Sequence, residues 1–162
     1  MFDLQRLAAG HAAALLRFEL ENRAYFARSI SDRGDDYFAE FAERHELLLA
    51  EQAAGLCHFH LVVDDDGAVL GRFNLVDVDQ GSAELGFRVA ERAAGQGLAT
   101  DTVRRICELA GTDYGLTRLV AAAALDNPGS LTVLRRNGFT PIEEIILVNR
   151  PGLRLGRDLT SR

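Results

Sequence analysis

The stretch RAAGQGLAT, residues 92–100, contains two glycines and three alanines and lies between a β-prone segment and an amphipathic one. Backbone N–H groups with small side chains at a helix start form a cradle for an anion, because the first amides have no partner inside the helix and the positive end of the helix dipole lies there. We therefore expect a phosphorylated ligand at this loop. Taken alone, an ordinary tight turn explains the two glycines equally well. The stretch lacks the G-K-[ST] of a P-loop and the G-x-G-x-x-G of a parallel βαβ unit, which disfavours a dinucleotide fold.

The segments before this loop predict strands. Residues 56–63 and 69–78 are short β-prone runs, and residues 64–67 read Asp-Asp-Asp-Gly, a composition typical of a hairpin turn. In residues 82–89 the apolar side chains alternate with polar ones, which places Glu84 on the polar face of a third strand. The three runs predict an antiparallel meander.

The segments after the loop alternate between helix and strand. Val103, Ile106, Cys107 and Ala110 have helical spacing, and this helix is expected to end near Gly111. Residues 119–125 predict a buried strand, and residues 142–148 and 153–159 predict the last two strands. Between them, Asn127 is expected to cap a short helix that begins at Pro128 and ends at Gly138.

Two helices are expected before residue 55, from the apolar residues that recur at helical intervals there. Together the segments predict one α/β (α+β) domain over residues 1–162 with a mixed, mostly antiparallel sheet flanked by helices. Its parts are helices in residues 1–55, a core in residues 56–139 and C-terminal strands in residues 140–162.

Composition excludes several classes of protein. The chain has 162 residues, 48% of them hydrophobic, a net charge of −6 and a sequence pI near 5.2. These values indicate a folded domain and argue against a nucleic-acid partner, which would favour a basic face. The longest apolar run is too short to span a bilayer, and residues 1–10 show no signal-peptide pattern. We expect a cytoplasmic protein with no membrane partner, in which Cys57 and Cys107 are reduced core residues.

The loop and the residues around it resemble the GNAT superfamily of acetyl-CoA-dependent N-acetyltransferases. The resemblance covers residues 69–139 and includes AELGF at 83–87, the Q/R-x-x-G-x-G/A pattern of the loop and N-x-x-S-x-x-V-L-x-x-x-G-F at 127–139. It implies a GNAT fold with a splayed sheet and acetyl-CoA as co-substrate, without a metal. The opening ENRAYF, residues 21–26, is similar to the RimJ/RimL branch, which acetylates protein N-terminal amines.

The resemblance also assigns residues to the coenzyme. Backbone amides of the loop would bind the pyrophosphate, the backbone of residues 87–89 would pair with the pantetheine arm as an added strand, and Asn127 would lie beside that arm. The coenzyme-binding residues expected in this way are Phe87, Arg88, Val89, Arg92, Ala94, Gly95, Gln96, Gly97, Leu98, Ala99, Thr100 and Asn127.

Two residues are candidates for catalysis. Glu84 matches a position where the family often keeps a carboxylate base, although a solvated strand carboxylate has the same pattern. Ser130 matches the serine that the RimJ/RimL branch places to protonate or hydrogen-bond the coenzyme sulfur, although a serine at this helix position also satisfies backbone donors. The tyrosine acid of another branch is absent, because its position holds Leu134. Residues 149–153 also lack the aromatic and Asp-His signature of the RimJ/RimL branch, so the acceptor stays open.

Two further patterns favour structural explanations. His58 and His60 share one strand face without a third ligand at metal spacing, so we interpret them as a structural pair. Seven acids against two arginines in residues 31–52 indicate a solvated helix face. The resemblance implies that the helices of residues 1–55 form the acceptor side and that residues 56–139 bind acetyl-CoA, so these acids could also steer a cationic amine.

The sequence therefore predicts an N-acetyltransferase in which a primary amine, an N-terminal α-amine of a protein or peptide, attacks acetyl-CoA directly in a ternary complex. The alternatives are an enzyme for a small amine, such as a polyamine, an amino acid or an aminoglycoside-like amine, and a non-catalytic acyl-CoA-binding regulatory module. The acyl-chain length and the oligomeric state, a homodimer included, stay open.

Overall fold

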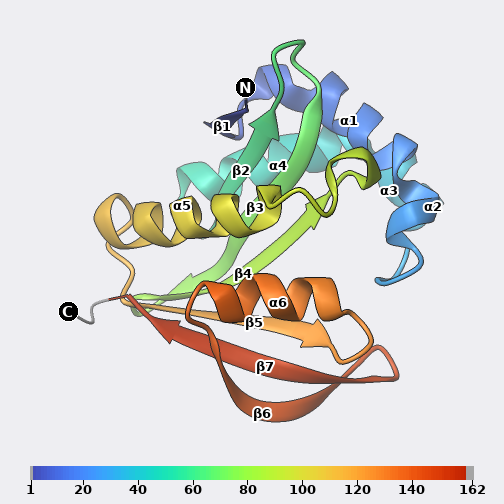
Figure 1. Cartoon of the computed structure of the whole chain (residues 1–162). Helices are drawn as coiled ribbons and strands as arrows, with labels where there is room; N and C mark the ends of the chain where they lie inside the picture. Colours follow the sequence, from blue (N-terminus) through green and yellow to red (C-terminus); the bar gives the residue numbers. More distant parts are fainter. Residues whose placement is uncertain (1, 160–162) are drawn as a thin grey trace. The chain divides into compact units, whose positions relative to one another are not determined.

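The computed structural model describes residues 2–159. Its strands form one seven-stranded sheet in the hydrogen-bonded order β1-β2-β3-β4-β5-β7-β6, in which β4 and β5 are parallel and the other described ladders are antiparallel (Figure 1). The elements follow one another as β1 (Asp3–Arg6), η1 (Ala9–His11), α1 (Ala12–Glu21), α2 (Arg23–Phe26), α3 (Asp35–Ala39), α4 (Phe41–Ala53), β2 (His58–Val63), β3 (Val69–Asp79), β4 (Ser82–Val89), η2 (Glu91–Ala93), α5 (Leu98–Thr112), β5 (Arg118–Ala124), α6 (Pro128–Arg136), β6 (Thr140–Leu147) and β7 (Arg150–Asp158).

The chain divides into two compact units. The first comprises Met1–Asn74 and Phe87–Ala94, and the second comprises Leu75–Gly86 and Gly95–Arg162. Strands β3 and β4 each contribute residues to both units.

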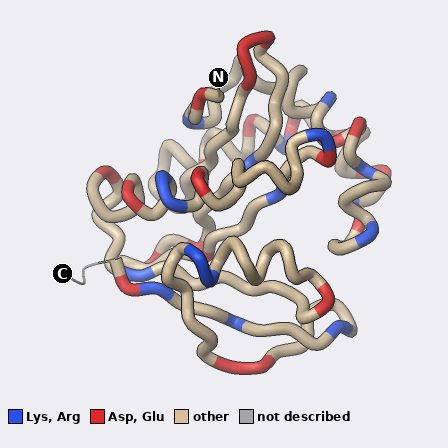
Figure 2. The backbone as a smooth tube through the Cα atoms, viewed as in Figure 1, with Lys and Arg blue, Asp and Glu red and all other residues tan. Residues whose placement is uncertain are grey.

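In the first unit, helices pack against the β1–β2 pair and the start of β3. Strand β1 pairs with β2 from Asp3 opposite Val63, and α4 contacts β2. The turn between β2 and β3 is held by the Asp64 carboxylate, whose Oδ1 accepts hydrogen bonds from the amides of Asp66 and Ala68. Gly67 takes φ of 84° in this turn, which favours glycine. The acidic tip of the hairpin is prominent in Figure 2.

In the second unit, α6 lies along β5 and contacts α5 (Figure 1). The parallel ladder joins Ser82–Leu85 to Arg118–Ala121, and β7 pairs with the whole length of β5. Outermost β6 is mostly exposed and carries an irregularity between Pro141 and Glu143. The core of this unit is apolar, and its most deeply buried side chains include Ile106, Leu119, Leu134 and Leu155.

The predicted fold class is confirmed, together with the hairpin, the strand at residues 82–89 and the helix that begins at Pro128. The expectation of two helices before residue 55 is wrong, because this region holds four α-helices and β1. Helix α1 ends where the Asn22 side chain donates to the carbonyl oxygen of Phe18, a hydrogen bond that competes with the next helical turn. Strand β1 has no clear alternation and is a strand because it pairs with β2. Residues 1 and 160–162 of the predicted domain lie outside the described residues.

Both cysteines are buried, as expected, and they form no disulfide within the described residues. Burial raises the pKa of the Cys107 thiol, against the lowering effect of the nearby Arg157 charge. Among residues 2–159, no helix has the length and apolarity needed to cross a bilayer.

Candidate active site

The start of α5 is open and rich in backbone donors. Gly95 and Gly97 adopt φ of 73° and 80°, both are exposed, and a Cβ at either position would meet no atom within 4 Å. Gly97 is the N-cap, and no side chain caps the helix. The amide of Asp101 makes the first backbone bond of the helix, to the carbonyl oxygen of Gly97. The amides of residues 98–100 therefore have no acceptor within the helix, which suits a bound anion.

The residues before this helix belong to the first unit. Arg92 in η2 is half exposed, and its Nη2 lies 3.5 Å from Oδ2 of Asp64 in the hairpin turn. Ala94 is exposed and extended. The structure therefore gives the Arg92 guanidinium an acidic neighbour that the sequence did not indicate.

The end of β4, Phe87–Val89, is half-buried. The ring of Phe87 stacks on Phe73 with 5.6 Å between centroids. Gly71 on β3 lets the Arg88 backbone and the Phe73 ring lie close to its own backbone. A Cβ at this position would lie 3.2 Å from the carbonyl oxygen of Arg88 and 2.9 Å from the Phe73 ring. These contacts fix the conformation of the segment expected to pair with pantetheine.

The start of α6 brings Asn127 and Ser130 together. The Asn127 side chain accepts a hydrogen bond of 3.4 Å from the amide of Ser130 and caps the helix, while Pro128 occupies the first turn. The Ser130 hydroxyl has no hydrogen-bond partner among residues 2–159. The capping role therefore belongs to Asn127, and the half-buried hydroxyl of Ser130 is available for another partner.

The end of α6 is tied to the start of α5. Buried Asn137 donates through Nδ2 to the carbonyl oxygens of Thr100 and Val133, at 3.2 and 2.9 Å. This side chain supports the first turn of α5, a role that the sequence pattern at 137–139 did not reveal. Leu134, at the position of the missing tyrosine acid, is buried in the core.

Glu84 is half-buried on β4 and lies opposite Val120 of β5 in the parallel ladder. Its carboxylate forms no hydrogen bond or ion pair with any of residues 2–159. A carboxylate without such a partner can accept a proton from a substrate.

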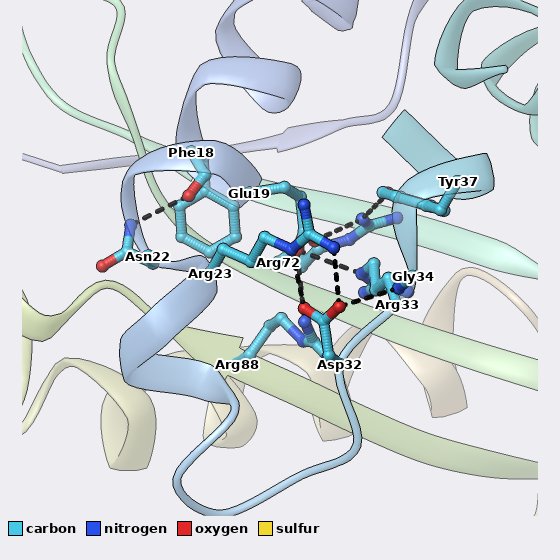
Figure 3. Close-up of polar contacts among 10 residues, drawn as sticks. All are labelled: Phe18, Glu19, Asn22, Arg23, Asp32, Arg33, Gly34, Tyr37, Arg72 and Arg88. Carbon is cyan, nitrogen blue, oxygen red and sulfur yellow. Dashed lines mark hydrogen bonds and ion pairs between the residues drawn. The ribbon is translucent and has the colours of Figure 1, made fainter. Parts of the chain in front are cut away.

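A buried polar cluster in the first unit was not predicted (Figure 3). Glu19 on α1 is 1% exposed, and its Oε2 accepts a 2.7 Å hydrogen bond from Arg72 on β3. Its Oε1 accepts from Arg33 Nε at 3.0 Å and from Arg88 Nη1 at 3.1 Å. Arg72 also donates to the Tyr37 hydroxyl at 3.1 Å. We call Glu19, Arg33, Tyr37, Arg72 and Arg88 the Glu19 cluster.

Electrostatics in this cluster favour a charged Glu19. Burial raises the pKa of the carboxyl, but the charges of Arg72, Arg33 and Arg88 outweigh it, so the pKa of Glu19 lies below its usual value. Burial, followed by repulsion from Arg33, lowers the pKa of Arg88 to about 10, against the attraction of Glu19. The only sign of this cluster in the sequence was Glu19 itself, an acid between apolar residues of an amphipathic helix. Its partners lie up to 69 residues away along the chain.

The two strand histidines make structural contacts. The His60 ring is buried and lies 3.2 Å from the carbonyl oxygen of Phe73, and the His58 ring lies 3.1 Å from Arg6. No group of three His, Cys, Asp or Glu side chains within residues 2–159 could hold a metal ion.

Comparison with known proteins gives the family. A model of the Acetyltransferase (GNAT) domain matches residues 2–140. This chain belongs to the GNAT acetyltransferases. Among curated relatives, the probable N-acetyltransferase YjcK of Bacillus subtilis (strain 168) is 25% identical over 130 residues, which cover 76% of this chain and 72% of that protein. The chain is thus an acetyl-CoA-dependent N-acetyltransferase, and the regulatory module without activity is set aside.

Solved structures share the fold. The ribosomal-protein-S5-alanine acetyltransferase from Vibrio fischeri superposes with a TM-score of 0.92 at 17% identity, covering 98% of this chain and 93% of that one. The spermidine N-acetyltransferase from Vibrio cholerae, solved in complex with CoA and spermine, superposes with a TM-score of 0.82 at 17% identity, covering 98% and 96%. These two GNAT proteins act on different amines, so their common fold leaves the acceptor unresolved.

Proposed function

We propose that this GNAT enzyme acetylates the N-terminal α-amine of a protein or peptide. The observation that carries the proposal is the half-buried carboxylate of Glu84, which has no partner among residues 2–159, together with the core leucine at position 134 in place of a tyrosine acid. Neutralising an α-amine at pH 7 requires about 1 kcal/mol, whereas a lysine ε-amine requires about 4.6 kcal/mol. A single carboxylate base is better matched to the first.

In this proposal the coenzyme binds through backbone groups. The amides at Gly95–Thr100 bind the pyrophosphate, the backbone of Phe87–Val89 pairs with the pantetheine arm, and Asn127 lies beside that arm. The uncapped start of α5, with two exposed glycines, supports the first assignment.

The proposed chemistry is direct transfer. Glu84 takes a proton from the acceptor ammonium, and the neutral nitrogen attacks the thioester carbonyl carbon. As the tetrahedral intermediate collapses, the C–S bond breaks, the protonated nitrogen loses its second proton, and the hydroxyl of Ser130 hydrogen-bonds the departing thiolate or relays that proton to it. The unpartnered hydroxyl of Ser130 supports this role.

A small cationic amine is the second candidate. Four of the seven acids in residues 31–52 have no ion-pair partner within residues 2–159, namely Asp36, Glu43, Glu46 and Glu51. These carboxylates favour a cation near the helices of the first unit. The spermidine enzyme among the structural neighbours makes this candidate worth testing. The cytoplasmic location and the homodimer stay predictions.

One pair of peptides separates the candidates. We expect a higher kcat/KM, measured by release of free thiol, for a peptide with a free terminus and an acetylated lysine than for the same peptide with an acetylated terminus and a free lysine. Glu84→Gln should lower kcat/KM for the α-amine peptide, whereas Glu144→Gln on exposed β6 should not. Faster acetylation of lysine or spermidine would replace the α-amine proposal by the small-amine one.

A further inference from the structure

The Glu19 cluster contains more positive charge than its own residues neutralise. Arg33, Arg72 and Arg88 share the single carboxylate of Glu19. The neighbouring arginines have acids of their own: Arg23 pairs with Asp32 and Asp35, and Arg44 pairs with Glu40. All three arginines pair with Glu19, so the cluster carries two positive charges in excess of its one described acid.

The cluster is closed on one side and open on the other. The side chains of Glu19 and Arg72 are 1% and 5% exposed, whereas those of Arg88 and Arg33 are 15% and 26% exposed. Arg33 donates only through Nε and Arg88 only through Nη1, so both guanidinium groups keep N–H donors without an acceptor in the described residues. The Nε of Arg72 is also buried without a partner there.

Unneutralised charge at low exposure is unfavourable, and an entering anion relieves it. Burial, and then repulsion from Arg33, lowers the pKa of Arg88. Guanidinium groups match a carboxylate in particular, because the two planar groups form parallel hydrogen bonds.

We propose that Arg33 and Arg88 bind a carboxylate of the acceptor, so that the enzyme selects peptides with an acidic side chain at one of the first two residues. This proposal rests on the proposed function, which makes the acceptor a peptide amine. The phosphates of the coenzyme are assigned to the start of α5 in the second unit, whereas Arg33 lies in the region that the family resemblance assigns to the acceptor. The occupant is therefore an acceptor carboxylate.

The first test compares matched peptides that differ only in Glu against Gln, at residue 1 in one pair and at residue 2 in another. We expect about a tenfold higher kcat/KM for the acidic member of at least one pair. Arg33→Gln should reduce that ratio to about one, whereas Arg28→Gln, an exposed arginine of the same unit, should preserve it. Equal rates within both wild-type pairs, or an unchanged ratio in Arg33→Gln, would overturn the proposal.

The second test needs no variant. The N-acetylated acidic peptide should inhibit wild-type enzyme competitively against the acceptor and bind about tenfold more tightly than its amide analogue. Equal binding, or competition against acetyl-CoA alone, would contradict the proposal. The same Glu and Gln pairs are also made in peptides whose acceptor is a lysine. The ratio within each pair is measured with the acceptor amine unchanged, so failure of the α-amine proposal and failure of this one can be distinguished.

Discussion

The two units differ in the polar groups that they bury. In the first unit the buried polar side chains include four ionisable ones, Glu19, His45, His60 and Arg72. In the described part of the second unit, the buried polar side chains are the neutral ones of Thr102 and Asn137. The first unit therefore depends on charges that distant segments bring together. The second presents backbone donors at the start of α5, which need no charged side chain.

This difference predicts how each unit responds to change. Removal of a buried charge should destabilise the first unit, and low pH should do the same. The second unit should be less sensitive to low pH, and substitutions in it should alter ligand binding more than stability.

The largest effect is expected for Glu19→Gln. The substitution keeps the size of the side chain but leaves three arginines without a counter-charge. Removal of one partner from a buried ion pair typically costs about 3–5 kcal/mol. We expect the free energy of unfolding, measured in urea, to fall by about that amount. Asp32→Asn removes an acid from an exposed pair and serves as the control, with a much smaller expected loss. Equal losses in the two variants would show that burial of the charge is unimportant.

The next effect is the pH dependence of stability. Burial, more than the nearby charges of Arg6 and His58, lowers the pKa of His60 to about 4, against the opposing hydrogen bond to Phe73. The folded state therefore resists protonation, while the unfolded chain binds a proton below about pH 6.5. The contribution of His60 to the free energy of unfolding should be fully present above pH 6.5. It should decline as the pH falls to 4, by up to about 3 kcal/mol. His60→Gln should reduce this decline in unfolding titrations across the range. The same pH dependence in wild type and variant would assign it to other groups.

A similar but smaller effect is expected for coenzyme binding in the second unit. A ligand at 100 times its dissociation constant stabilises the fold by about 2.7 kcal/mol. Gly97→Asp puts a carboxylate at the open N-cap and should remove the thermal shift given by CoA. Gly97→Asn is a neutral control of the same shape at the same positive φ and should keep more of the shift. A full shift in Gly97→Asp would place the pyrophosphate elsewhere.

The smallest effect is expected for Ser130→Ala. If the hydroxyl assists the thiolate, kcat should fall about tenfold, which corresponds to about 1.4 kcal/mol, while the affinity for acetyl-CoA stays near the wild-type value. The cap formed by Asn127 uses the amide of residue 130, so stability should change little. Loss of stability with unchanged turnover would make Ser130 a structural residue only.

The elements that could be predicted from the sequence are those with local signals. The turn at residues 64–67 has a glycine at positive φ, and α6 begins with Asn127 and Pro128, so neighbouring residues determine both structures. The open start of α5 is local in the same sense, because its donors are consecutive amides.

The features that were missed depend on contacts between distant residues. Strand β1 exists through its pairing with β2, about sixty positions away along the chain. The Glu19 cluster joins residues from α1, the segment before α3, α3 itself, β3 and β4, so no single stretch carries its pattern. By contrast, the acidic run in residues 31–52 was expected to be a solvated face, and all seven of its acids are exposed, three of them in surface ion pairs with Arg23 and Arg44.

Two-substrate kinetics tests the central claim most directly, namely that the start of α5 holds the coenzyme and that Arg33 holds the acceptor. Initial rates of thiol release are measured over a grid of acetyl-CoA and acidic-peptide concentrations for wild type, Gly97→Asp and Arg33→Gln. We predict a higher KM for acetyl-CoA in Gly97→Asp alone and a higher KM for the peptide in Arg33→Gln alone. A higher peptide KM in Gly97→Asp with an unchanged KM for acetyl-CoA, or the reverse pattern in Arg33→Gln, would contradict the account.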